Sequence, residues 1–480
     1  MGLLLVTATG ICSMMGASIN VIPFMIQKNV PGIGPYVVPA FLFAAIPAIF
    51  AAYAYAILSS AMPRAGGSYL YASRGLSPYL GFIASFSQWF GLSIVIGVIS
   101  YIIVPFIRDV FFNLGFINIS DFLEVGSVRL TISLLLIWFF VLINIVGGKV
   151  YKNTLIPMLV IMFVLGSIVL ITGLVYDQND FINSVLNSEN RVIEPTSDIK
   201  FDWKIFLTAA TLMFSSFIGF DAIAQTGNEA KNPTKNIPRA ILLAIFIVAS
   251  YYILFTISVY NIVPWSFVAD ESITKDITAP GLLSYVLPPF WGILIIIGAA
   301  IALINDLPAM ILSVSRLMFA WAKDNIFPNR VALIHSKFNT PYIAIILVGV
   351  VASIGAIGSH FAGDFFLGID IMVTSMMINF LLMCVTLISI QKVNFKLFKN
   401  ITVIKNRAIQ LFIGYTGTLI ILIFLIIHTY KDLSSNVEEW YFHSTYIYLI
   451  VMIIASIYFA LRWKTVQVKN NNTFKTLPVE

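Results

Sequence analysis

Long apolar runs, separated by short polar segments, fill almost the whole chain. Each run is long enough, at about 1.5 Å per residue, to cross roughly 30 Å of hydrocarbon as a helix. The pattern therefore predicts an all-α integral membrane protein with about twelve transmembrane helices. The expected spans are residues 4–26, 35–61, 79–107, 129–147, 153–175, 204–228, 238–262, 290–318, 342–360, 365–390, 408–429 and 444–463.

The composition supports a lipid-embedded chain and argues against a soluble domain. Hydrophobic residues make up 59% of the sequence and charged residues only 10%, whereas an ordinary soluble domain is about a quarter charged. The formal net charge of +6 does not indicate nucleic-acid binding, because the basic residues lie in short loops between apolar runs. The expected surroundings are therefore a lipid bilayer, with no nucleic acid as a partner.

The positions of the basic residues predict the orientation. Most of the 28 lysines and arginines fall in every second loop and in the C-terminal tail, and the intervening loops are richer in Asp and Glu. Loops rich in Lys and Arg stay in the cytoplasm. We therefore expect a multi-pass protein of the cell membrane with both termini in the cytoplasm.

The first and sixth predicted spans are interrupted by small and polar residues. Residues 13–20 (SMMGASIN) interrupt the first, and Ser215, Ser216 and Gly219 interrupt the sixth. Irregular backbone at membrane depth is tolerated only where it is buried in protein or lines a cavity. Broken helices in matching positions indicate a transporter's binding site. The alternatives are a close contact between helices for the first span and a kinked packing helix with a hydrogen-bonded Asp for the sixth.

Three motifs resemble those of the amino acid–polyamine–organocation transporters, over roughly residues 8–400. Two departures from the helix 1 motif are Ser18, where glycine is usual, and Asn20, where phenylalanine is usual. The residues that carry the resemblance are Gly16 to Asn20, the loop Pro63-Arg64-Ala65-Gly66-Gly67, and Phe214 to Asp221 followed by Lys231-Asn232-Pro233 and Asn236 to Ile241.

The resemblance implies a five-plus-five inverted repeat of the LeuT type with discontinuous helices 1 and 6 and two extra C-terminal helices. Helices 3, 8 and 10 are then expected around the substrate. The implied divisions are residues 1–175 for the first repeat (helices 1–5), 176–203 for an outward connector, 204–392 for the second repeat (helices 6–10), and 393–480 for helices 11–12 and a cytoplasmic tail.

We expect the two breaks to bind the substrate. The α-carboxylate should meet backbone N–H groups of residues 17–19 at the positive end of a half-helix. The α-ammonium should meet carbonyls near the helix 6 break and those of Ser13 or Met14. The expected substrate-binding residues are Ser13, Met14, Gly16, Ala17, Ser18, Ile19, Asn20, Phe214, Ser215, Ser216, Phe217, Ile218 and Gly219.

Two acids within the spans are the candidates for coupling or gating. Asp221 follows the helix 6 break and is expected either to cap freed backbone or to act as a protonatable gate. Asp306 lies about 15 Å along helix 8 from Arg316, where relatives carry a small or hydroxyl residue. A charged Asp at that depth costs about 2.5–3.5 kcal/mol. Asp306 is therefore expected to hold a proton or sodium ion, or to form a structural hydrogen bond near Pro308.

The predicted function is secondary active transport of amino acids or related amines by alternating access, as a permease or exchanger. Coupling to protons or sodium, or antiport, is expected. The alternatives are a non-transporting amino acid sensor or a subunit of a larger membrane complex. No enzyme, cofactor or metal site is expected, because the histidines and cysteines show no catalytic or ligand spacing. Loop 108–128 has no cysteine, so we expect no disulfide-linked heavy chain.

Overall fold

The computed structural model describes the chain apart from residues 17, 194–198, 275, 363–365, 438, 470–472 and 479–480. The described residues form helices and connecting loops, with no strand among them. Twelve of the described helical stretches are long and apolar enough to cross a membrane. The predicted fold class, an all-α protein with twelve spans, is confirmed.

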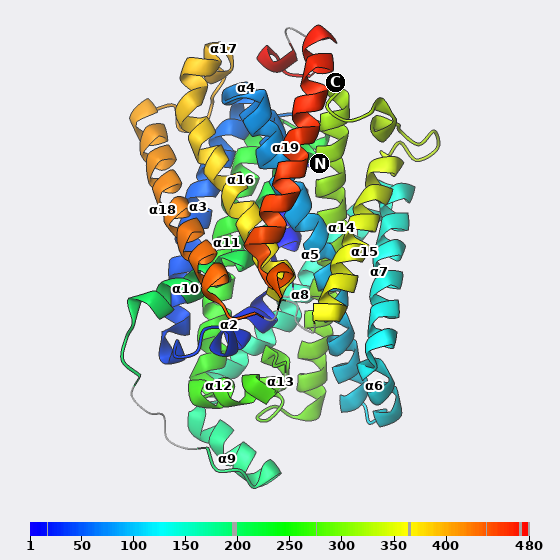
Figure 1. The fold of residues 1–480 in the computed structure, drawn as a ribbon. Helices are drawn as coiled ribbons and strands as arrows, with labels where there is room; N and C mark the ends of the chain where they lie inside the picture. The colour runs from blue at the N-terminus through cyan, green and yellow to red at the C-terminus, as the bar shows by residue number, and fades with distance from the viewer. Residues whose placement is uncertain are drawn as a thin grey trace.

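Shorter helices connect some of the spanning segments (Figure 1). The spanning helices are α1 (Leu3–Met14) with α2 (Ser18–Asn29), α3 (Val37–Ala61), α5 (Pro78–Asn113), α7 (Gly126–Val146), α8 (Gly148–Val175), α10 (Trp203–Met213) with η2 (Phe214–Phe217) and η3 (Phe220–Glu229), α11 (Pro233–Ile262), α14 (Pro289–Lys323), α15 (Tyr342–Ala362), α16 (Phe366–Val393), α18 (Arg407–Ser434) and α19 (Ser444–Lys469). The shorter helices are η1 (Gly34–Tyr36), α4 (Gly67–Gly75), α6 (Ile117–Glu124), α9 (Gln178–Glu189), α12 (Trp265–Thr274), α13 (Ala279–Leu283), η4 (Asn329–Ala332), α17 (Phe395–Phe398), η5 (Trp440–Phe442) and η6 (Thr473–Lys475).

Each predicted span corresponds to one of these helices, and the differences lie at their ends. Helix α11 begins at Pro233 instead of residue 238, because proline is favoured at the first helical position, where its missing N–H is not needed. Helix α5 continues to Asn113, beyond the predicted end at residue 107. Hydropathy detects the apolar part of a helix, and both extensions are amphipathic or polar.

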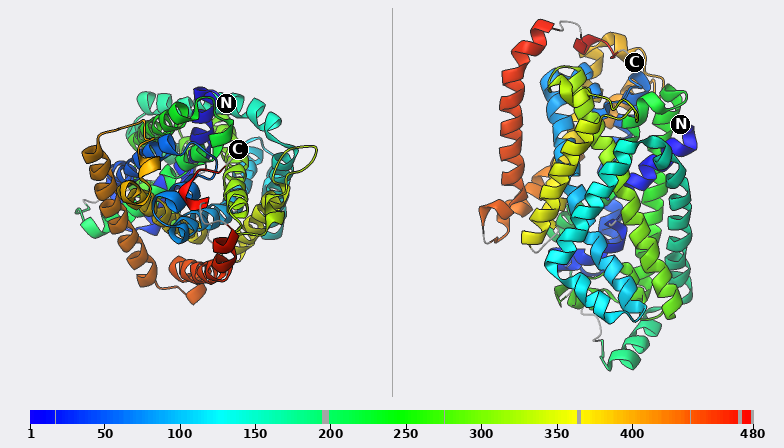
Figure 2. Two further views of the ribbon diagram at one scale, coloured as in Figure 1. Left: turned by 90° about the horizontal axis from the view of Figure 1, so that it is seen from above. Right: turned by 90° about the vertical axis from the view of Figure 1, so that its right-hand side faces the viewer.

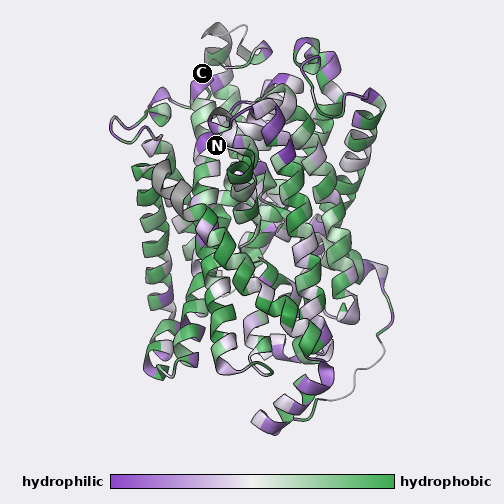
Figure 3. Cartoon of the chain, turned by 180° about the vertical axis from the view of Figure 1, so that it is seen from behind, coloured by the Kyte–Doolittle hydropathy of each residue, from purple (hydrophilic) through white to green (hydrophobic). Residues whose placement is uncertain are grey.

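Both chain termini lie at one end of the bundle, together with α4 and α17 (Figure 1). We call this end the termini face. Helices α6, α9, α12 and α13 lie at the opposite end. Hydrophobic residues dominate the middle of the bundle, and hydrophilic residues gather at the two ends (Figure 3). Side chains such as Leu135, Phe139 and Leu142 are exposed on α7, as expected of a helix that faces lipid. The chain is a multi-pass membrane protein.

Helix α5 is the centre of the bundle and packs against α14, α15 and α16. Its contact with α15 is made backbone to backbone at Gly97 and Gly355. A Cβ atom at Gly97 would lie 2.8 Å from the carbonyl carbon of Gly355, and one at Gly355 would lie 3.0 Å from that of Ile94. Small residues allow this close approach in membranes. Helices α18 and α19 lie at the edge of the bundle (Figure 2).

The loop between α3 and α4 turns at two glycines, Gly66 and Gly67. Gly66 has φ +119° and Gly67 has φ +42°, a region that glycine adopts without steric cost. The N–H of Gly66 donates to Oε1 of Gln225 at 3.2 Å, so this turn is attached to η3. Asn325, after α14, also has a positive φ of +62°, in a region that Asn enters more readily than most residues.

Candidate functional site

The first spanning segment is broken between α1 and α2. Helix α1 ends at Met14 and α2 begins at Ser18. The carbonyl oxygen of Met14 accepts hydrogen bonds from the N–H of Gly16 at 3.0 Å and from the hydroxyl of Tyr252 at 2.5 Å. Tyr252 lies on α11 and satisfies a carbonyl that the end of α1 leaves free. Nothing in the sequence distinguished this tyrosine from the other aromatics of the spans.

The sixth spanning segment is broken at Ile218 and Gly219. The backbone is extended at Ile218, with φ −82° and ψ +137°, and Gly219 has φ +134°. The segment then continues as η3, a 3₁₀-helix of 10 residues, although 3₁₀-helices longer than three or four residues are uncommon and often mark hinges. A Cβ atom at Gly219 would lie 2.6 Å from the carbonyl carbon of Ser13. Glycine therefore lets the two breaks touch.

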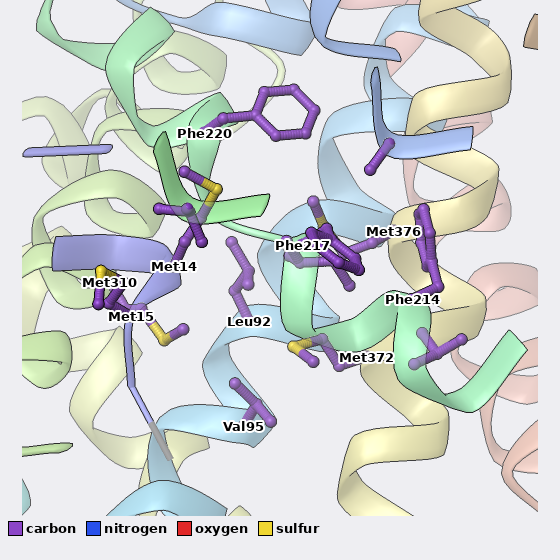
Figure 4. Packing of buried hydrophobic residues seen from close by; sticks show 14 of the residues in the cluster. Met14, Met15, Leu92, Val95, Phe214, Phe217, Phe220, Met310, Met372 and Met376 are labelled. Atoms are coloured by element: carbon purple, nitrogen blue, oxygen red, sulfur yellow. The ribbon is translucent and has the colours of Figure 1, made fainter. Parts of the chain in front are cut away.

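A cavity of about 50 Å³ lies between the two breaks. Its lining includes Met14, Val95, Met310 and Met372, each on a different helix, and Figure 4 shows these four side chains among the packed hydrophobic residues. Six of the predicted site residues line this central cavity: Ser13, Met14, Gly16, Ser215, Ile218 and Asp306. The remaining lining is apolar and comes from α2, α5, α14 and α16: Val21, Ile22, Val95, Val98, Ile99, Ile102, Met310, Ile369 and Met372.

The other predicted site residues that the structure describes are not among those that line this cavity. Ile19 and Asn20 line a separate cavity of about 20 Å³ with Met162. Phe217 packs 5.2 Å from Phe41, centroid to centroid. Phe214 is similarly packed, 6.0 Å from the ring of Phe380. Ser216 is buried, and the backbone of Gly219 lies against Ser13. Ala17 lies outside the described residues, and of Ser18 only the backbone is described.

The carboxylate of Asp221 accepts hydrogen bonds from the helix 6 break and from α5. Its Oδ1 accepts a hydrogen bond from the N–H of Gly219 at 3.2 Å, and its Oδ2 accepts one from Nε2 of Gln88. Ser68 on α4 donates to the other end of Gln88 at 2.5 Å. Gln88 lies about two helical turns before Val95 on α5, roughly 10 Å nearer the termini face. Asp221 therefore lies between the central cavity and the termini face and is not among the residues that line the cavity.

Asp306 lies beside the helix 1 break and lines the central cavity. It is 2% exposed. A Cβ atom at Gly16 would lie 3.0 Å from Cγ of Asp306, so the carboxyl group fills the space that the glycine leaves open. No residue that the structure describes donates a hydrogen bond to Oδ1. Asp306 is thus an acid at mid-membrane depth that lines the cavity, and its Oδ1 can accept a hydrogen bond from a ligand.

A larger cavity, of about 390 Å³, lies at the termini face between α4 and α14. Its walls carry charges of both signs. Nη1 of Arg74 pairs with Oδ2 of Asp324 at 2.6 Å, and the hydroxyl of Tyr69 donates to the same oxygen at 2.6 Å. Arg316 and Glu229 form a second ion pair. This vestibule is polar, in contrast to the central cavity.

Comparison with known proteins identifies relatives of this chain. The family model described as "Amino acid permease" matches residues 1–455. An uncharacterised transporter of Mycobacterium bovis is 34% identical over 152 residues, which cover 31% of this chain and 33% of that protein. The branched-chain amino acid permease BcaP of Bacillus subtilis is 28% identical over 31% of each chain. The mouse (Mus musculus) cationic amino acid transporter 4 is 28% identical over 33% of this chain and 24% of its own length. The aligned stretches thus span a third or less of these relatives.

Proposed function

Since this chain belongs to the amino acid permease family, a family of transporters and not of enzymes, we propose that it is a secondary active transporter of amino acids or related amines. It moves them across the cell membrane by alternating access, as a permease or an exchanger. The observation that carries this proposal is the contact between the two helix breaks, at Ser13 and Gly219, beside a central cavity at membrane depth. Broken helices supply unpaired backbone groups for a substrate's charges.

The small volume of the central cavity supports a site that must open to admit its substrate. Ligand sites for small molecules usually measure about 300–1,000 Å³, whereas this cavity measures about 50 Å³. Helices must therefore separate to admit a substrate, as alternating access requires. We place the substrate's carboxylate on the backbone of residues 17–19, at the start of α2, and its ammonium in the same cavity, near Ser13 and Ser215. The two termini lie in the cytoplasm, so the polar vestibule is the inner exit.

Coupling to a proton or sodium gradient, or exchange of one substrate for another, drives the cycle. Asp221 and Asp306 are the acids at membrane depth that could carry the coupled charge. Asp221 joins η3 to α5 through Gln88 and to the helix 6 break through Gly219. A proton on Asp221 removes the negative charge that Gln88 and the Gly219 N–H stabilise. Protonation therefore loosens the contact between η3 and α5 on the inner side of the cavity.

We expect the Asp221→Asn variant to transport with a flattened pH dependence. Asn resembles the protonated acid, so the step that responds to pH no longer titrates, while substrate exchange continues. The measurement is initial uptake and exchange in proteoliposomes between pH 5 and 8. Asp202→Asn is the matched control, because Asp202 caps α10 outside the bundle and Asn caps equally well. A pH profile identical to that of the wild type would remove Asp221 from the coupling mechanism.

The proposed function is tested by uptake of a panel of labelled amino acids and amines into proteoliposomes, with and without pH and sodium gradients. Accumulation that requires the protein and responds to a gradient, or to an internal exchange substrate, is the expected result. Binding of a substrate without any uptake or exchange would instead identify a sensor or a subunit that needs a partner.

A further inference from the structure

The central cavity contains one charged group and little else to attract a polar ligand. Of its described lining residues, Asp306 alone carries a formal charge, and no Lys, Arg or His is among them. Two serines, Ser13 and Ser215, are the other polar side chains. The hydroxyl of Ser215 already donates to the carbonyl oxygen of Leu212 at 2.7 Å. The carboxylate of Asp306 is therefore the dominant recognition group.

Two backbone acceptors beside the cavity, the carbonyl oxygens of Met14 and Ser215, are already engaged. The carbonyl oxygen of Met14 accepts from Tyr252 and from Gly16. The carbonyl oxygen of Ser215 accepts from the N–H of Ile218 at 3.2 Å. These are among the carbonyls that the sequence led us to expect on the substrate's ammonium group. In the structure they are satisfied, whereas Oδ1 of Asp306 has no partner among the described residues.

A buried carboxylate without a partner needs a proton or a cation. An ammonium group supplies both a positive charge and hydrogen-bond donors, and charge-assisted hydrogen bonds are the strong ones. The rest of the cavity is lined by aliphatic and thioether side chains from α2, α5, α14 and α16. Such a lining accommodates an apolar group, and its described side chains include no cation that would pair with a carboxylate.

We propose that Asp306 binds the ammonium group of the substrate, so that the site selects primary amines with a compact apolar body. The proposal rests on the proposed function and makes it narrower. Recognition requires the cation, whereas the carboxylate that we place on the backbone of residues 17–19 is not required. An amine that lacks a carboxylate is therefore a ligand, and an acid that lacks the amine is not.

Three compounds with the same branched apolar body separate these features: isoamylamine, L-leucine and 4-methylpentanoate. Their binding to the purified full-length protein in detergent is measured by thermal unfolding. Isoamylamine and L-leucine are expected to raise the unfolding temperature with increasing concentration, and 4-methylpentanoate to leave it unchanged. Equal stabilisation by 4-methylpentanoate, or stabilisation by none of the three, would overturn the proposal.

The Asp306→Asn variant tests the residue itself. Removing one partner of a desolvated charge pair is expected to weaken binding of both amines about 30-fold or more. Asp202→Asn makes the same chemical change outside the cavity and should bind as the wild type does. Wild-type amine affinity in Asp306→Asn would overturn the ammonium site and leave Asp306 an ion-coupling role. If that variant does not fold, the comparison of the three compounds on the wild type still decides the question.

The outcome also separates this inference from the proposed function. If the protein shows gradient-driven uptake but Asp306→Asn does not change its affinity for amines, the ammonium site alone is refuted. If Asp306→Asn removes amine binding but the wild-type protein catalyses neither uptake nor exchange, transport alone is refuted.

Discussion

Replacement of Gly16 by leucine is expected to abolish substrate binding and transport while the protein remains folded. The added Cβ atom would lie 3.0 Å from Cγ of Asp306, and the rest of the side chain would enter a cavity of only about 50 Å³. Overpacking of this kind costs about 1–3 kcal/mol of stability, which a bundle of this size tolerates. The loss of binding is complete because the leucine occupies the substrate's place.

The control for this variant is Gly358→Leu. Gly358 lies on α15 with no atom within 4 Å of an added Cβ, so the same substitution there should leave binding and stability unchanged. Binding of the labelled substrate and thermal unfolding are measured for both variants. Normal binding by a folded Gly16→Leu protein would place the substrate site elsewhere.

Replacement of Arg74 by methionine is expected to lower the free energy of unfolding by about 3–5 kcal/mol. Arg74 is 1% exposed, and its guanidinium group pairs with Asp324 and contacts the ring of Phe474 in the C-terminal tail. Methionine keeps much of the volume but leaves the buried carboxylate of Asp324 without its cation. The uncompensated charge, and not the lost packing, accounts for most of the effect.

A second substitution separates the charge effect from the packing effect. In the double variant Arg74→Met, Asp324→Asn, the carboxylate is neutral, and the hydroxyl of Tyr69 can still donate to the amide oxygen. More than half of the lost stability should therefore return. Thermal unfolding of the two single variants and the double variant provides the measurement. A double variant as unstable as Arg74→Met would show that the ion pair contributes little and that packing dominates.

The fold could be predicted from the sequence because its main determinants are local. Apolar runs long enough to cross the bilayer define the twelve spans without reference to any partner. The breaks are also marked locally: a run of small and polar residues surrounds the first, and Gly219, whose φ is +134°, lies at the second. Even the turn at Gly66 and Gly67 depends on the conformational freedom of glycine, which is read directly from the chain.

The composition of the site was less predictable, because it depends on how each helix is rotated. Val95, Val98, Ile99 and Ile102 share one face of α5 with helical spacing, but every face of a buried spanning helix is apolar. The chain gives no local sign that this face meets the cavity. Asn20, a polar residue in the broken helix, faces another cavity for the same reason.

Polar contacts between residues far apart in the sequence could not be predicted from the sequence either. Gln88 and Asp221 are separated by 133 positions, and Tyr252 reaches Met14 across 238. A glutamine or tyrosine in an apolar span is an ordinary residue until its partner is known. Asp306 was identified as exceptional because its burial is costly wherever the helix faces. Its position in the cavity required the packing of α14 against α1.

Substrate protection of a cysteine at position 215 is the most direct test that the central cavity is the transport site. Cys12 and Cys384 are buried and would first be replaced by alanine. The rate at which a small cationic thiol reagent labels Ser215→Cys is measured with and without the amine that the uptake panel identifies. Ser353→Cys, on α15 and outside the cavity lining, is the control. We predict that substrate slows labelling at position 215 and leaves position 353 unchanged. Undiminished labelling at position 215 under saturating substrate, in a variant that still transports, would contradict the central claim.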